Sequence, residues 1–133
     1  MPGLRNVMRA NAASCLVFGA VFSTQPAWVA HGLGGSVPPP SALIVVLGIA
    51  LILNGLHLLW AASRQALNRM LLLYFSAGDF VWVVGTLGLL ASGQWITTPL
   101  GTWATLVVAI AVGAFGILQF AGWRENGRRV AHP

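Results

Sequence analysis

The sequence predicts an all-α integral membrane protein, a single domain of four transmembrane helices arranged as two helical hairpins. Three observations lead to this prediction. Of the 133 residues, 57% are hydrophobic and only 7% are charged, whereas soluble domains carry roughly 25% charged residues. The seven basic residues are all arginines, gathered in three short clusters. Between the clusters lie apolar stretches that approach or exceed the ~20 residues needed to cross a bilayer core.

The first hairpin is expected to contain two spans. The first span covers about residues 11–29, and the second covers about 41–62, after the prolines at 38–40. Ser41 is expected to be the N-cap of the second span, because its hydroxyl can accept from an unpaired N–H of the first turn. Arg5 and Arg9 before an apolar run also fit a signal peptide, and cleavage near Ser23 would leave three spans.

The second hairpin is expected to contain the other two spans. The third covers about residues 67–90, and the fourth covers about 99–123. Thr98 is the expected cap of the fourth span. Pro99 then takes the first helical position, where its missing N–H removes no hydrogen bond.

The connecting segments alternate in charge. Residues 25–40 and 92–98 contain no charged side chain, whereas 63–69 contain two arginines and the two ends of the chain contain the rest. The positive-inside rule therefore predicts that both termini and the second loop are cytoplasmic, and we expect a bacterial inner (plasma) membrane. Interfacial anchors are expected at five tryptophans: Trp28, Trp95 and Trp103 outside, Trp60 and Trp123 inside.

Asp79 is the residue that most needs an explanation. It follows Arg69 by ten residues, or ~15 Å at ~1.5 Å per residue, which is near the bilayer centre. A charged aspartate at that depth costs at least ~2.5–3.5 kcal/mol. We therefore expect it to face the bundle interior, to be protonated or to have a partner.

Depth matching suggests which side chains surround Asp79. In a tight hairpin of the second and third spans, Asn54 reaches the level of Asp79, and His57 reaches that of Ser76. Glycines at 48 and 55 match those at 85 and 78, and small residues let membrane helices approach closely. The predicted intramembrane polar cluster is Asn54, His57, Ser76, Asp79 and Trp82, with Cys15 and Gln119 as edge residues.

Two interpretations of this cluster stay open. It is either a set of hydrogen bonds that fixes helix pairing, or a site for a proton, an ion or a polar solute. Haem bound through His57 is a weaker hypothesis, because one intramembrane histidine per chain cannot form a bis-histidine site unless two chains pair. We expect no other cofactor, no metal site and no catalytic residues, since the sequence shows no paired carboxylates, phosphate loop or nucleophile elbow.

The leading functional expectation is a non-enzymatic accessory or scaffold subunit. It would lie in the lipid bilayer as a homo-oligomer or as part of a larger membrane complex, and it would not bind nucleic acid. The alternative is a small oligomeric transporter or channel with an Asp79, Asn54 and His57 site. A third hypothesis is a membrane oxidoreductase that uses His57 or Cys15. We find no motif specific to a known family.

Overall fold

The computed structural model describes residues 3–131, with side chains up to residue 127. Over that range the regular secondary structure is helical, without strands, and four of the helices are long and apolar enough to cross a membrane. This confirms the predicted fold class. The helices are α1 (Leu4–Thr24), α2 (Pro26–Gly34), α3 (Ser41–Ser63), α4 (Arg69–Ser92) and α5 (Pro99–Ala131).

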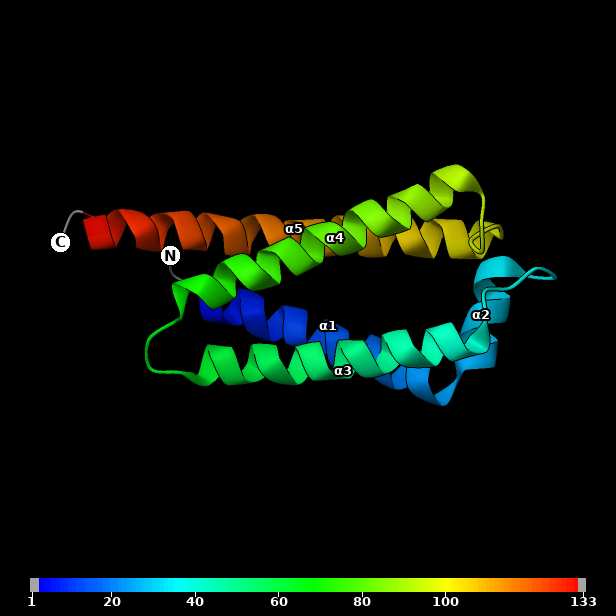
Figure 1. The fold of residues 1–133 in the computed structure, drawn as a ribbon, viewed down its shortest axis with the longest axis horizontal. Coiled ribbons are helices and arrows are strands. Elements are labelled where there is room, and N and C mark those ends of the chain that lie inside the picture. Colours follow the sequence, from blue (N-terminus) through cyan, green and yellow to red (C-terminus); the bar gives the residue numbers. More distant parts are fainter. Residues whose placement is uncertain (1–2, 132–133) are drawn as a thin grey trace.

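The long helices pair as two hairpins (Figure 1). Helix α1 packs along α3, α4 packs along α5, and α1 also touches α5, which joins the hairpins. Both termini and the α3–α4 loop lie at one end of the bundle, and the short α2 lies at the other. We call these the arginine-rich end and the α2 end, because every arginine lies in or beside the segments at the first of them.

The first predicted span is wrong at both boundaries. Helix α1 begins at Leu4 and includes Arg5 and Arg9, so it extends further toward the arginine-rich end. It stops at Thr24, because Gln25 leaves the helical region and Pro26 starts a separate helix. The residue before a proline is biased away from helical angles, which explains the break.

The other boundaries lie closer to expectation. Thr98 caps α5 as predicted: its hydroxyl accepts from the N–H of Gly101 at 2.9 Å, and Pro99 is the first helical residue. Ser41 is not the N-cap of α3, since it is the first helical residue and Pro40 precedes it. Helix α5 continues past the predicted end to Ala131, and the side chains of Arg128 and Arg129 lie outside the described residues.

Small residues spaced seven apart bring α1 and α3 into backbone contact. A Cβ on Gly48 would lie 2.9 Å from the carbonyl oxygen of Gly19, and one on Gly55 would lie 3.1 Å from that of Ala12. Seven residues are nearly two helical turns, so these positions repeat along one seam. Such close approach is how membrane helices gain packing energy without a hydrophobic driving force.

Arg5 fastens the arginine-rich end of this seam. Its guanidinium donates to the main-chain carbonyls of Ala62, Arg64 and Gln65. These carbonyls lie at or just after the end of α3, where a helix leaves oxygens without intrahelical partners. A cation is also favoured there by the helix dipole.

Helices α4 and α5 approach at Gly116. Its carbonyl accepts from the hydroxyl of Ser76 at 2.8 Å, and a Cβ there would lie 3.2 Å from Cβ of Asp79. The expected glycine pairing between α3 and α4 is wrong. A Cβ on Gly78 or Gly85 would meet nothing within 4 Å, because α3 packs on α1 instead.

Candidate functional site

Asp79 lies at the junction of the two hairpins. It is only 7% exposed, and its Oδ2 accepts from Nε2 of Gln119 at 2.6 Å and from Nδ2 of Asn11 at 3.0 Å. Asn11 also donates to Oε1 of Gln119 at 3.3 Å. The three side chains therefore form a closed triangle that joins α1, α4 and α5.

The direction of the Cα–Cβ bonds explains why these residues meet. In a helix this bond tilts toward the N-terminus. Helix α4 starts at the arginine-rich end, so the side chain of Asp79 tilts toward that end. Helix α5 starts at the α2 end, so the side chain of Gln119 tilts toward the α2 end. The two side chains converge although Gly116 is the residue of α5 that lies opposite Asp79.

A second set of hydrogen bonds extends the triangle to α3. The thiol of Cys15 donates to Oδ1 of Asn11 at 3.7 Å, and Nδ2 of Asn54 donates to Sγ of Cys15 at 3.4 Å. The side chains of Asn54, Cys15, Asn11, Asp79 and Gln119 thus form one chain of hydrogen bonds across all four long helices. We call these five residues the polar chain.

The structure separates the predicted cluster into parts. Gln119 and Cys15, expected at its edge, belong to the polar chain together with Asn54 and Asp79. Ser76 is 1% exposed and bonds to α5 instead. The expected direct pairing of Asn54 with Asp79, and of His57 with Ser76, is wrong, because α3 and α4 do not pack along each other.

His57 belongs to a group of aromatic side chains. Its ring lies 5.0 Å from that of Phe75, 6.0 Å from that of Tyr74 and 5.8 Å from that of Trp60, measured between centroids. The ring therefore packs between α3 and α4 rather than against the polar chain. Trp82, expected to need a buried acceptor, is only half-buried.

Asn11 is the central residue that the sequence did not indicate. It comes two residues after Arg9 and is the first residue of the predicted first span, 11–29. Because α1 begins seven residues earlier, Asn11 lies inside the bundle and is 2% exposed. A signal was present: Asn11, Cys15 and Phe18 recur at helical spacing on one face.

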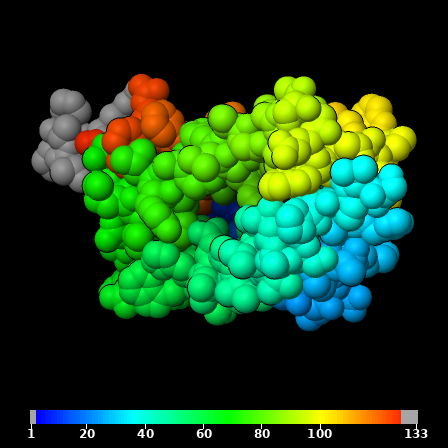
Figure 2. Space-filling model, turned by 45° about the vertical axis from the view of Figure 1, so that its right-hand side comes forward, coloured from blue at the N-terminus to red at the C-terminus, as the bar shows by residue number. Residues whose placement is uncertain are grey.

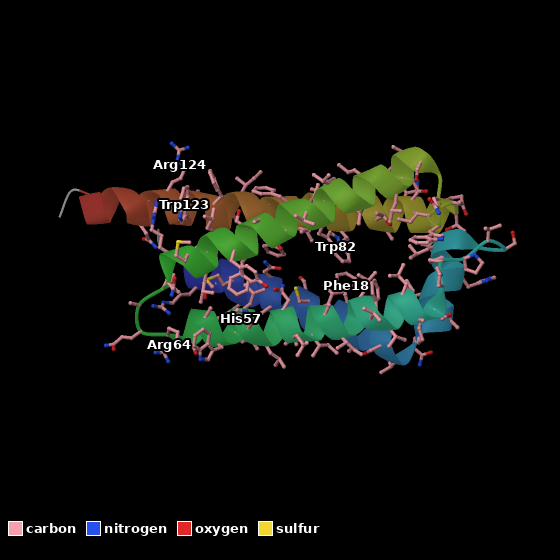
Figure 3. All side chains as sticks on the ribbon, viewed as in Figure 1. Phe18, His57, Arg64, Trp82, Trp123 and Arg124 are labelled. Carbon is pink, nitrogen blue, oxygen red and sulfur yellow. The ribbon has the colours of Figure 1, made fainter. Side chains whose placement is uncertain are left out.

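A hollow opens between α3 and α4 (Figure 2). The space-filling view shows dark-blue atoms of the N-terminal half of α1 at its floor, and that half carries Asn11. Phe18, His57 and Trp82 extend from α1, α3 and α4 toward the space between α3 and α4 (Figure 3). The hollow thus lies on the side of the bundle, over the N-terminal part of α1.

Trp123 and Arg69 form a separate contact near the arginine-rich end. Nε1 of Trp123 is the one fully buried side-chain nitrogen or oxygen without a hydrogen-bond partner in the described part of the chain. The guanidinium carbon of Arg69 lies 4.4 Å from the centroid of this indole ring, and its Nε donates to the Trp123 carbonyl at 3.0 Å. This contact fastens α4 to α5.

The fold and the polar chain define a polytopic four-helix membrane protein with a hydrogen-bonded core. Among the residues with described side chains, no group of three or more His, Cys, Asp or Glu could hold a metal ion. No family model matches the sequence, and neither a curated protein nor a solved structure matches it significantly.

Proposed function

We propose that this protein is a non-enzymatic subunit of a membrane assembly. The observation that carries the proposal is that the polar side chains of the core bond to one another. Toward the α2 end, the hydroxyls of Ser23, Thr24 and Thr86 bond to carbonyls of their own helices. The hydrogen bonds of the polar chain are suited to hold the bundle in a fixed shape.

An exposed stripe on α5 supports the same proposal. Leu100, Trp103, Val107 and Ile110 are 72%, 69%, 63% and 75% exposed, and their spacing alternates between three and four residues. This is the spacing by which one helix packs along another. We propose that the stripe contacts a transmembrane helix of a partner, either another membrane protein or a second copy.

Membrane orientation and localisation belong to the proposal as well. The arginine-rich end would face the cytoplasm, because cytoplasmic loops carry an excess of basic residues. A bacterial plasma membrane is the setting that we expect.

Native mass spectrometry tests the assembly. The tagged protein would be extracted with surrounding lipid from its own host membrane, and the expected result is a defined stoichiometric complex. Ile110→Trp should break that complex, whereas Val81→Trp should not, because Val81 is equally exposed at 72% but lies on α4. Both variants stay apolar and tolerate lipid. A bare monomer in every extraction would contradict the proposal.

A transporter or channel is the second candidate, and one observation favours it. Oδ1 of Asp79 accepts no hydrogen bond from the described side chains and is not among the fully buried unpaired atoms. Some water or solute could therefore reach the carboxyl group. Proton flux into liposomes that is lost in Asp79→Asn would favour transport over assembly.

A further inference from the structure

The carboxyl group of Asp79 is bonded on one side only. Oδ2 accepts from the side-chain amides of Asn11 and Gln119. Oδ1 accepts from no described side chain and is not among the fully buried unpaired atoms, although the residue as a whole is only 7% exposed. The hollow of Figure 2 lies over the N-terminal part of α1, the helix whose Asn11 donates to this carboxyl group. A carboxyl oxygen in apolar surroundings gains free energy from a cation or a hydrogen-bond donor placed beside it.

Aromatic rings lie along the helices on both sides of Asp79. Phe18 is seven residues beyond Asn11 on α1, and Trp82 is three residues beyond Asp79, so both lie toward the α2 end. On the opposite side, His57 and Tyr74 pack together 6.0 Å apart. Aromatic faces attract cations and also provide apolar contact, and such a mixture is typical of small-molecule sites.

Small residues keep the hollow open. Gly78 and Gly85 lie on the flank of α4 that also carries Trp82, and a Cβ on either would meet nothing within 4 Å. Ala50 of α3 is also exposed. The opening is on the side of the bundle, so a molecule dissolved in the bilayer would enter it more readily than a hydrated one.

We propose that the hollow between α3 and α4 binds a lipophilic organic cation, an ammonium group on an aromatic body, with the ammonium at Oδ1 of Asp79. The body lies among Phe18, Trp82 and the wall formed at Gly78. Among the residues with described side chains, the hydrogen bonds to this carboxyl group come from Asn11 and Gln119, and Arg69 faces Trp123 instead. This inference goes beyond the proposed function and does not depend on it.

The test is direct binding of tritiated 4-phenylbutylammonium to the full chain in nanodiscs, with empty nanodiscs subtracted for partition into lipid. Saturable binding is expected, and Asp79→Asn should weaken it at least tenfold. Gly78→Leu should block it by filling the hollow. Gly88→Leu is the matched control: it is the same change at another open glycine of α4, nine residues from Asp79 and thus on about the opposite face.

Each outcome is decisive once size-exclusion profiles show that the variants fold. Loss in Asp79→Asn and Gly78→Leu, with retention in Gly88→Leu, supports the site. Absence of saturable binding by the unmodified chain overturns it, as does unchanged binding in Asp79→Asn or Gly78→Leu. Equal competition by neutral 4-phenylbutanol would also overturn it, because the hollow would then bind apolar chains regardless of charge. None of these results bears on whether a partner complex forms.

Discussion

Nε2 of Gln119 lies 2.6 Å from Oδ2 of Asp79, although the two residues are 40 positions apart and not level along their antiparallel helices. The contact exists because each side chain leans toward the N-terminus of its own helix. Asn11 adds a donor from the other hairpin to the same oxygen. The most polar contact in the core is therefore also the junction between the hairpins.

Asn11→Ala should destabilise the bundle although no motif singles this residue out. The change removes donors to both Asp79 and Gln119, and we expect a loss of about 1–2 kcal/mol in the free energy of unfolding. Unfolding in mixed micelles would measure it. Asn6→Ala is the control, because Asn6 is exposed on the same helix and, among the described residues, accepts a hydrogen bond from Arg9. Equal effects of the two changes would contradict the role of Asn11.

Gly48→Ala should separate α1 from α3. The new methyl group would lie 2.7 Å from the main-chain nitrogen of Ser23 and 2.9 Å from the carbonyl of Gly19. Forcing extra volume into a packed interface costs typically about 1–3 kcal/mol. Gly85→Ala, where nothing lies within 4 Å, should instead be neutral or stabilise by up to about 1 kcal/mol through helix propensity. Thermal unfolding of both variants in one lipid mixture would show whether their effects differ in sign.

Arg5→Ala should loosen the arginine-rich end of the α1–α3 hairpin. Three carbonyls at the end of α3 lose a charged donor, for which we expect about 1–3 kcal/mol. Hydrogen exchange should show faster opening of the last turn of α3 in this variant. Arg9→Ala should leave that turn unchanged, since Arg9 is exposed and, within the described part of the chain, donates to Asn6 of its own helix. Protection that is unaffected by Arg5→Ala would refute this role.

Cysteine labelling in intact cells should reveal the orientation. In a Cys15→Ala background, Ser36→Cys near the α2 end should react with a membrane-impermeant maleimide. Ala66→Cys, at the arginine-rich end, should react only after permeabilisation. Both positions are exposed. The reverse pattern would mean that the positive-inside rule fails for this chain.

The sequence predicts where the four long helices lie along the chain, but it does not predict which helices pack against one another. Apolar length and the arginine clusters located the four spans, and the Thr98–Pro99 pair located the start of α5. The Gln25–Pro26 pair also held the signal for the end of α1, although the apolar run continues past it.

Depth counting gives a level in the bilayer and says nothing about which helix lies beside which. Depth counting pairs Asn54 with Asp79. In the structure, Gly48 and Gly55 pack α3 against α1, and Asn54 therefore bonds to Cys15. Gln119 was predicted only as an edge residue, because depth counting ignores the tilt of its side chain toward the α2 end, where α5 begins. Faces and neighbours depend on packing, which depth does not encode.

A double-mutant cycle between Asp79 and Gln119 tests most directly whether their contact holds α4 and α5 together at the point where Asn11 of the other hairpin joins them. Asp79→Leu, Gln119→Leu and the double variant would be unfolded in the same micelles as the unmodified chain. We predict a coupling free energy of about 1–2 kcal/mol, above the ~0.6 kcal/mol average for membrane hydrogen bonds because a carboxyl group is involved. Additive effects, with a coupling below about 0.3 kcal/mol, would contradict the account.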